Sequence, residues 1–241
     1  MGKIYIMSDI HGLYDRYEAM LEKIGLQDGD RLYVLGDVID RGPDSFKILQ
    51  DIMDRENVEL FLGNHEHMML TYLDGLDRKS WFFAANGGKE TYQKLMKLDS
   101  GQREQIVSYI RNETAVIRNL EINGHSYILS HTGVMTDGRD RFTRDYAGKL
   151  MEIQDFVWNM FPYSLEMLSY YGRIEKPVVL ISGHIISRRL SGKDEVYIHD
   201  FENGYVWYNI DCGCAMGDGL GRLSCLRIDE DGEIGEIFYV E

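Results

Sequence analysis

The chain is poor in cysteine, and the few that it has follow no regular spacing. Only three of its 241 residues are cysteines, namely Cys212, Cys214 and Cys225, and no two of them form a Cys-x-x-Cys pair. An odd number of clustered thiols fits reduced cysteines better than a disulfide framework. The spacing also lacks the ligands that a structural zinc site requires.

Long apolar runs and basic clusters are missing as well. No run approaches the ~20 residues of a membrane-spanning helix, and no signal-peptide core is present. Lys and Arg number 26 against 40 Asp and Glu, which gives a net charge of −14. So acidic a surface repels duplex nucleic acid and anionic membranes. We therefore expect a cytoplasmic protein that binds neither membrane nor duplex nucleic acid.

The composition is otherwise that of an ordinary globular protein. Hydrophobic residues make up 44% and charged residues 27% of the chain. This composition argues against disorder, and the length suffices for one large domain with a substantial core. No linker or low-complexity segment interrupts the sequence, so we predict a single domain over residues 1–241.

Five short apolar runs each end abruptly in residues that bind metals or protons. Runs of about four apolar residues without polar alternation are typical of strands buried on both faces. The runs cover residues 4–7, 32–35, 60–62, 127–129 and 178–181. Helical patterns lie between them, as over residues 14–24, so we predict a layered α/β domain. In such sheets the carboxyl ends of the strands line the ligand crevice, where the five polar clusters could meet.

The remaining segments complete the predicted architecture. Residues 67–124 look mainly helical, with one helix over 100–112 that Ser100 would cap. Residues 139–172 are rich in aromatic side chains and are predicted to form a helical cap over the site. From Lys193 onward the pattern is typical of strands joined by turns.

The polar clusters supply a mixed set of nitrogen and oxygen ligands. The set comprises Asp9, His11, Asp37, Asn64, His131 and His184. Such ligands suit Mn²⁺, Fe or Zn²⁺ better than Mg²⁺ or Ca²⁺ alone. Six ligands fit two ions that share a bridging carboxylate. Two divalent ions, two aspartates and a bridging hydroxide sum to about +1, which favours a phosphate substrate and in-line attack by that hydroxide.

Three further residues complement these ligands. His65 follows Asn64 and could protonate the leaving oxygen as a general acid. Asp40 could hydrogen-bond that imidazole and hold it charged. Arg41 offers a planar guanidinium that could bind a pair of phosphoryl oxygens.

Three sequence blocks carry a resemblance to a known family. Residues 8–12 are SDIHG, residues 36–42 are GDVIDRG, and residues 63–66 are GNHE. They resemble the signature blocks of the metallophosphoesterases, and more narrowly those of the PPP-type serine/threonine protein phosphatases in their bacterial and phage-like branch. Residues 130–133 and 182–185 match the two later histidine blocks. Residues 86–91 and 210–223 are similar to weaker blocks of the bacterial branch.

The resemblance implies a fold of two central β-sheets flanked by helices, an αββα sandwich. It also implies which ligands bind which ion: Asp9, His11 and Asp37 would bind one, and Asp37, Asn64, His131 and His184 the other. His65 would then be the acid, Asp40 its partner and Arg41 a phosphate clamp. One departure concerns Met160, because relatives tend to have a second phosphate-binding arginine just after the tryptophan at the position of Trp158. Three candidate replacements are Arg144, Arg173 and Arg188.

The sequence leaves the substrate open between two hydrolase functions. The main prediction is a serine/threonine protein phosphatase with two divalent ions, Mn²⁺ first among them. The alternative is a dinucleoside polyphosphate hydrolase of the diadenosine tetraphosphate type, because the same family includes bacterial enzymes of that kind. A catalytically inactive scaffold is disfavoured, since such proteins usually lose a ligand or the acid, and here all are retained.

Overall fold

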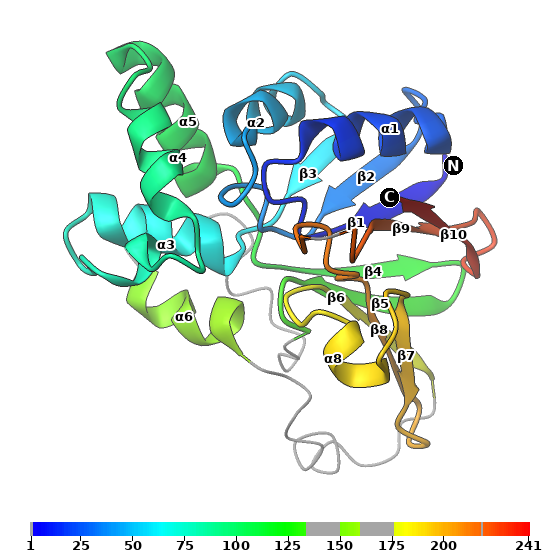
Figure 1. The fold of residues 1–241 in the computed structure, drawn as a ribbon. Coiled ribbons are helices and arrows are strands. Elements are labelled where there is room, and N and C mark those ends of the chain that lie inside the picture. Colours follow the sequence, from blue (N-terminus) through cyan, green and yellow to red (C-terminus); the bar gives the residue numbers. More distant parts are fainter. Residues whose placement is uncertain (1, 134–149, 160–175, 218) are drawn as a thin grey trace.

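The computed structural model describes residues 2–133, 150–159, 176–217 and 219–241, which build two stacked five-stranded sheets (Figure 1). The first sheet has the strand order β10-β9-β1-β2-β3. Its strands are β1 (Ile4–Met7), β2 (Arg31–Val34), β3 (Val58–Leu60), β9 (Leu223–Ile228) and β10 (Ile234–Val240). The second sheet has the order β4-β5-β6-β8-β7. Its strands are β4 (Ile117–Ile122), β5 (His125–Ser130), β6 (Val178–Ser182), β7 (Tyr197–Asp200) and β8 (Tyr205–Asn209).

Both sheets are mixed, with a parallel centre. In the first, β1 pairs in parallel with β2 and β2 with β3, while β9 and β10 add antiparallel strands at one edge. In the second, β5, β6 and β8 are parallel neighbours between the antiparallel strands β4 and β7. The parallel strands carry the site, because the residues that follow their carboxyl ends gather at one edge of the sandwich.

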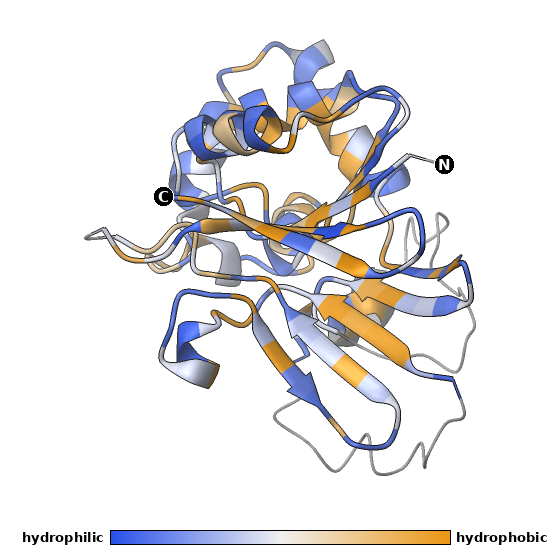
Figure 2. Ribbon diagram, turned by 90° about the vertical axis from the view of Figure 1, so that its right-hand side faces the viewer, coloured by the Kyte–Doolittle hydropathy of each residue, from blue (hydrophilic) through white to orange (hydrophobic). Residues whose placement is uncertain are grey.

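The alternation of side chains along β1 explains why its apolar run is unbroken. Tyr5 and Met7 pack into the core between the first sheet and the helices. Ile4 and Ile6 pack instead into the core between the two sheets, with residues such as Tyr127 and Ile181 of the second sheet. Successive side chains of a strand point to opposite faces, so a strand buried on both faces requires apolar residues throughout. Figure 2 shows the two sheets as stacked layers, with hydrophobic stretches along strands of both.

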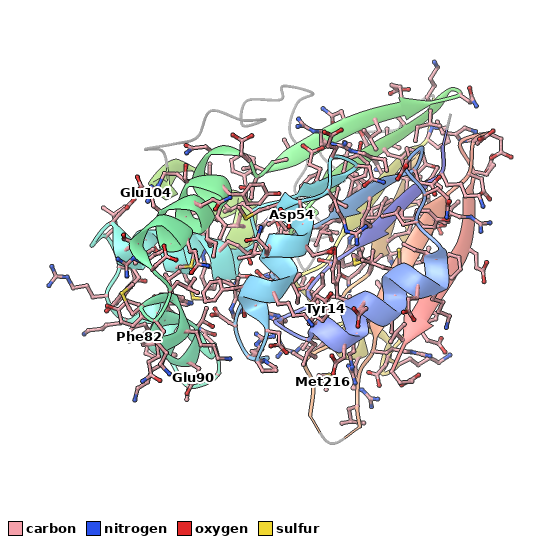
Figure 3. All side chains as sticks on the ribbon, turned by 90° about the horizontal axis from the view of Figure 1, so that it is seen from above. Tyr14, Asp54, Phe82, Glu90, Glu104 and Met216 are labelled. Carbon is pink, nitrogen blue, oxygen red and sulfur yellow. The ribbon has the colours of Figure 1, made fainter. Side chains whose placement is uncertain are left out.

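Helices α1 (Tyr14–Ile24) and α2 (Ser45–Met53) cover the outer face of the first sheet (Figures 1 and 3). The apolar stripe of α1 buries Tyr17, Met20 and Ile24, and the helix ends at Gly25 in the left-handed conformation. Glycine favours that position because it has no Cβ to clash with the backbone. The 14–24 helix predicted from the sequence is thus present with the same bounds.

The other helices gather at one end of the first sheet. They are α3 (Asn64–Leu73), the 3₁₀ turn η1 (Ser80–Phe82), α4 (Gly88–Leu95), α5 (Ser100–Asn112) and α6 (Leu150–Trp158). Helix α6 packs against α3. The short helix α8 (Arg188–Ser191) lies beside the second sheet (Figure 1). In the described part of the chain, no helix has the length and apolarity to span a membrane.

Two sequence-based expectations need correction. The segment 67–124 is helical only as far as Asn112, because residues 117–122 form the edge strand β4, whose exposed and less exposed side chains alternate. The side chain that caps α5 is that of Asp99, which accepts a hydrogen bond from the Gln102 backbone N–H, rather than that of Ser100. Of the predicted cap over 139–172, only α6 falls within the described residues, and the rest lies outside them.

A nearly buried ion pair links the two sheets. The Glu59 carboxylate on β3 accepts two hydrogen bonds from Arg118 on β4, at 3.1 Å from Nε and 2.5 Å from Nη2. Arg31 on β2 approaches the same carboxylate at 3.4 Å. The side chain of Glu59 is only 8% exposed, so the carboxylate depends on these guanidinium groups for its compensation.

Arg118→Met should lower the free energy of unfolding by roughly 2–3 kcal/mol, because it leaves the Glu59 carboxylate buried with only the more distant Arg31. Urea denaturation measures the change. Arg111→Met is the matched control, since Arg111 forms a comparable bidentate pair with Asp74, whose side chain is 33% exposed. Such surface pairs are worth about 0–1 kcal/mol. Equal losses in the two variants would contradict the role given to burial.

Candidate metal centre

The six predicted ligands lie together at the carboxyl ends of strands from both sheets. Asp9 and His11 follow β1, Asp37 follows β2, and Asn64 follows β3 in the first sheet. His131 follows β5 and His184 follows β6 in the second. All but His131 line one cavity of about 190 Å³. His131 is buried against that group, with its Nε2 3.0 Å from Asn64 Oδ1 and 3.5 Å from Asp37 Oδ1.

The backbone at these strand ends adopts an uncommon conformation. Eight described non-glycine residues have positive φ, and six of them belong to the predicted site: Asp9, His11, Asp37, Asp40, Arg41 and His184. Each such residue costs free energy that the surrounding structure must offset. Strain concentrated in this way is typical of sites where the placement of side chains outweighs local stability.

Glycines allow the loops to approach one another. A Cβ on Gly63 would lie 2.2 Å from Asp37 Oδ1 and 2.4 Å from the Asp37 nitrogen. A Cβ on Gly183 would lie 2.0 Å from Asp9 Oδ2. Any other residue at either position would push an aspartate out of place, so these glycines are required by the site and not only by the turns.

The buried Glu66 carboxylate ties two of the loops together. It accepts hydrogen bonds from four backbone N–H groups, those of Asp37 (2.9 Å), Val38 (2.9 Å), Ile39 (3.2 Å) and Gly63 (3.0 Å). These bonds offset the cost of burying a carboxyl group, which raises the pKa of Glu66 to about 7. Glu66 therefore fixes the backbone from which Asp37 projects.

Asp37 stands at the centre of the cluster. One of its oxygens, Oδ2, lies 3.8 Å from His11 Nε2 and 3.9 Å from His65 Nε2. The other, Oδ1, accepts a hydrogen bond from the His65 backbone N–H at 2.9 Å. Two groups of side chains have ligand atoms within 4.8 Å of one another, namely His11–Asp37–His65 and Asp37–His131–His184, and Asp37 belongs to both. This is the position of a carboxylate that could bridge two ions.

Backbone carbonyls orient two of the imidazoles. His11 Nδ1 is 3.0 Å from the Ile39 carbonyl oxygen, and His131 Nδ1 is 2.7 Å from that of Leu35. Since a carbonyl oxygen only accepts hydrogen bonds, each Nδ1 must carry the proton, which leaves the lone pair of Nε2 directed at the cluster. Neutral imidazoles with a free Nε2 are the form that binds metal ions.

The protein by itself does not fully balance the charges of the cluster. Burial raises the pKa of Asp9 and of Asp37 well above the usual range, and it lowers the pKa of His11 and of His131. Among the described residues, neither aspartate forms an ion pair with a lysine or arginine. Bound divalent cations would compensate both carboxylates and accept the free imidazole lone pairs, so the donor set fits metal ions.

Asp40 contacts one ring nitrogen of His65, the predicted acid. His65 Nδ1 lies 2.7 Å from Asp40 Oδ2, which also accepts a hydrogen bond from Trp81 Nε1 at 2.8 Å. The sequence led us to expect that Asp40 holds this imidazole charged. Burial opposes that charge, since it lowers the pKa of His65 and raises the pKa of Asp40 to about 7. The clear consequence of the contact is orientation, because it directs Nε2 toward Asp37.

Arg41 projects into the same cavity. Its guanidinium nitrogens lie 2.7 Å from His11 Nε2 and 3.3 Å from His65 Nε2. Of the arginines considered as a second phosphate ligand, Arg188 is bound to Asp194 through Nε at 2.6 Å and through Nη2, and it does not line the cavity. Arg144 and Arg173 lie outside the described residues, as does Met160. Besides Arg41, the adjacent Arg189 lines the cavity.

Asp211 is a second residue that the sequence analysis did not assign to the site. It follows β8, is 4% exposed, and lines the cavity with Asp9 and Asp37. Burial raises its pKa to about 6, while the charges of Arg41 and Arg189 lower it. The signal was available, because the strand pattern over 205–210 ends in an acidic residue as the other five runs end in ligands. Arg189 had no comparable signal.

Comparison with known proteins agrees with this geometry. Residues 2–188 match the calcineurin-like phosphoesterase family. A symmetrical bis(5'-nucleosyl)-tetraphosphatase of Delftia acidovorans is 26% identical over 66% of this chain and 56% of its own length. The asymmetrical bis(5'-nucleosyl)-tetraphosphatase PrpE of Bacillus subtilis is 27% identical over 63% of each chain. The chain thus spans less than two thirds of the length of these curated relatives.

A solved structure shares the fold. A candidate diadenosine tetraphosphatase superimposes with a TM-score of 0.59 at 21% identity, covering 99% of this chain and 93% of that one. The two central mixed sheets with flanking helices, predicted from the resemblance, are therefore confirmed.

Glu66→Ala should lower the free energy of unfolding by at least ~3 kcal/mol, because it leaves several buried backbone N–H groups without an acceptor. Chemical denaturation followed by circular dichroism measures this loss. Glu104→Ala, on the exposed face of α5 (Figure 3), is the control and should change stability by less than ~0.5 kcal/mol. A Glu66→Ala protein as stable as the control would show that water or relaxed loops replace the carboxylate.

Proposed function

The chain belongs to the calcineurin-like phosphoesterase family, and from this premise we propose that it hydrolyses dinucleoside polyphosphates with the help of two divalent metal ions. The observation that carries the proposal is the shared position of Asp37 in two groups of potential ligands. A single carboxylate between two such groups suits a pair of ions better than one ion.

The proposed ligand assignment follows the sequence prediction. Asp9, His11 and Asp37 would bind one ion, and Asp37, Asn64, His131 and His184 the other. Bound there, two ions would lower the pKa of a shared water and stabilise the charge on the phosphoryl group. The mixed nitrogen and oxygen donors make Mn²⁺ the first ion to test, with Fe and Zn²⁺ next.

The other side chains would act on the substrate directly. The Arg41 guanidinium, which reaches both His11 and His65, can donate two parallel hydrogen bonds to phosphoryl oxygens and so align the group for attack. His65, with Nδ1 held by Asp40, can present Nε2 to the leaving oxygen and donate a proton to it. Asp40 would then be a positioning residue.

The choice of substrate rests on the relatives. Both curated relatives are named as bis(5'-nucleosyl)-tetraphosphatases. This supports the dinucleoside polyphosphate alternative of the sequence analysis better than its main prediction, a serine/threonine protein phosphatase. Hydrolysis of phosphoproteins stays a prediction, and the assay below therefore compares a phosphopeptide with the dinucleotide.

With added Mn²⁺, the purified protein should hydrolyse diadenosine tetraphosphate with a kcat/KM at least tenfold above that for a phosphoserine peptide. Product analysis by ion-exchange chromatography measures both rates. Asp37→Asn should abolish both activities and lower the bound metal found by elemental analysis, because it removes the proposed bridge. Asp28→Asn, the same change at an exposed position, should leave them intact.

Two results would contradict the proposal in different ways. Faster hydrolysis of the phosphopeptide would return the protein to the serine/threonine phosphatase prediction. Full activity after metal has been stripped would refute the metal-dependent mechanism itself.

His65→Asn should slow hydrolysis of phenyl phosphate by about a hundredfold or more. The phenolate that leaves this ester is poorly stabilised as an anion, so its oxygen requires a proton. The loss should be markedly smaller for p-nitrophenyl phosphate, whose leaving group is stable as an anion. Steady-state rates for the two esters measure the difference. His125→Asn is the control, because the His125 side chain is 40% exposed at the start of β5. Equal losses with both esters would assign His65 a role other than that of an acid.

A further inference from the structure

A larger cavity lies beside the metal-site cavity and shares lining residues with it. This second cavity has a volume of about 430 Å³, within the range of ~300–1,000 Å³ that is typical of small-molecule sites. The two cavities share a wall that includes Arg41, Arg189 and Asp211. A molecule bound at the metal site could therefore extend along these residues into the second cavity.

Arg189 is a residue of the shared wall whose guanidinium has no role in the reaction described so far. It lies on the short helix α8 and has an exposed side chain. Among the described residues, this side chain forms no hydrogen bond or ion pair. Its neighbour Arg188 is engaged by Asp194. Arg189 lines both the metal-site cavity and the second cavity, so it lies on the side of the metal site and not toward bulk solvent alone.

The rest of the second cavity has a different character. Ala85, Ala215 and Met216 line it and do not line the metal-site cavity, while Asn86 lines both. Figure 3 shows Met216 on the loop that follows β8. Asn86 is held in place by a hydrogen bond from Nδ2 to the Ser80 carbonyl oxygen at 2.7 Å. Apolar side chains with one fixed amide are the kind of surroundings that bind the planar base of a nucleotide.

We propose that Arg189 binds phosphate groups beyond the one that is cleaved, and that the second cavity receives the nucleoside attached to them. The inference deepens the proposed function and rests on it for the nature of the substrate. A phosphomonoester ends at the cleaved phosphate and gains nothing from a second guanidinium outside the metal site. A polyphosphate chain carries further negative charge, and a guanidinium can bind it through paired hydrogen bonds.

The test compares two inhibitors of p-nitrophenyl phosphate hydrolysis, tripolyphosphate and orthophosphate, with Mn²⁺ kept in excess over both. Arg189→Gln should raise the inhibition constant of tripolyphosphate about tenfold or more, the loss expected when a charged hydrogen-bond partner is removed. The inhibition constant of orthophosphate should change by less than about twofold. Arg188→Gln is the matched control and should change neither constant.

Either of two outcomes would overturn the inference. If Arg189→Gln weakens both inhibitors equally, Arg189 acts on the cleaved phosphate. If it weakens neither, Arg189 is a solvated surface residue.

Diadenosine tetraphosphate turnover by the wild-type protein is scored separately from the inhibition data. If the wild type fails to cleave it while Arg189 still discriminates between the inhibitors, the proposed function falls and the polyphosphate site stands. If turnover proceeds with an unchanged KM in Arg189→Gln, the function stands and this inference falls.

Discussion

The burial of Asp37 is the constraint on which the rest of the site depends. The Asp37 side chain is 3% exposed, and its carboxylate lies within 4 Å of imidazole nitrogens from His11, His65 and His131. Burial lowers the pKa of His11 and of His131 and so favours their neutral form. A neutral imidazole cannot balance the charge of a carboxylate. The sandwich therefore creates an unmet demand for positive charge at one point, which two divalent ions would satisfy.

Asp37 stays in this buried position only because the surrounding backbone is fixed in place. Asp37 has a φ of 53°, and five other site residues share its left-handed conformation, so the loops would relax if they stood alone. The parallel strands fix where each loop begins. Glu66 then joins the loop after β2 to the loop after β3, and the missing Cβ of Gly63 lets them meet. Strain at the site is thus offset by hydrogen bonds from backbone N–H groups to the single carboxylate of Glu66.

The sequence predicts that the candidate ligands gather at one place, because the signals for them are local. An unbroken apolar run next to Asp9 or Asp37 reports burial on both faces of a strand, and parallel strands bring such ends together. Asp211 obeys the same rule after β8 and could have been found by it. Arg189 could not, because Arg188 and Arg189 are chemically identical neighbours on one turn of helix. In the structure Asp194 binds Arg188, while Arg189 lines the cavity. The strand β4 was missed for a related reason, since its pairing with β5 is decided by the neighbouring strand and not by its own short, partly polar pattern.

The distribution of charge connects the fold to the class of ligand. A chain with a net charge of −14 repels polyanions over most of its surface, so an anionic substrate must find positive charge confined to the site. Arg41 provides some at the metal cluster, and Arg189 provides more along the route to the second cavity. An extended polyphosphate would meet both guanidinium groups, whereas a compact phosphate would meet only the first. Under the proposed role of Arg189, selectivity for longer phosphate chains would need no specific recognition of the base, because a second cation beside the metal site would supply it.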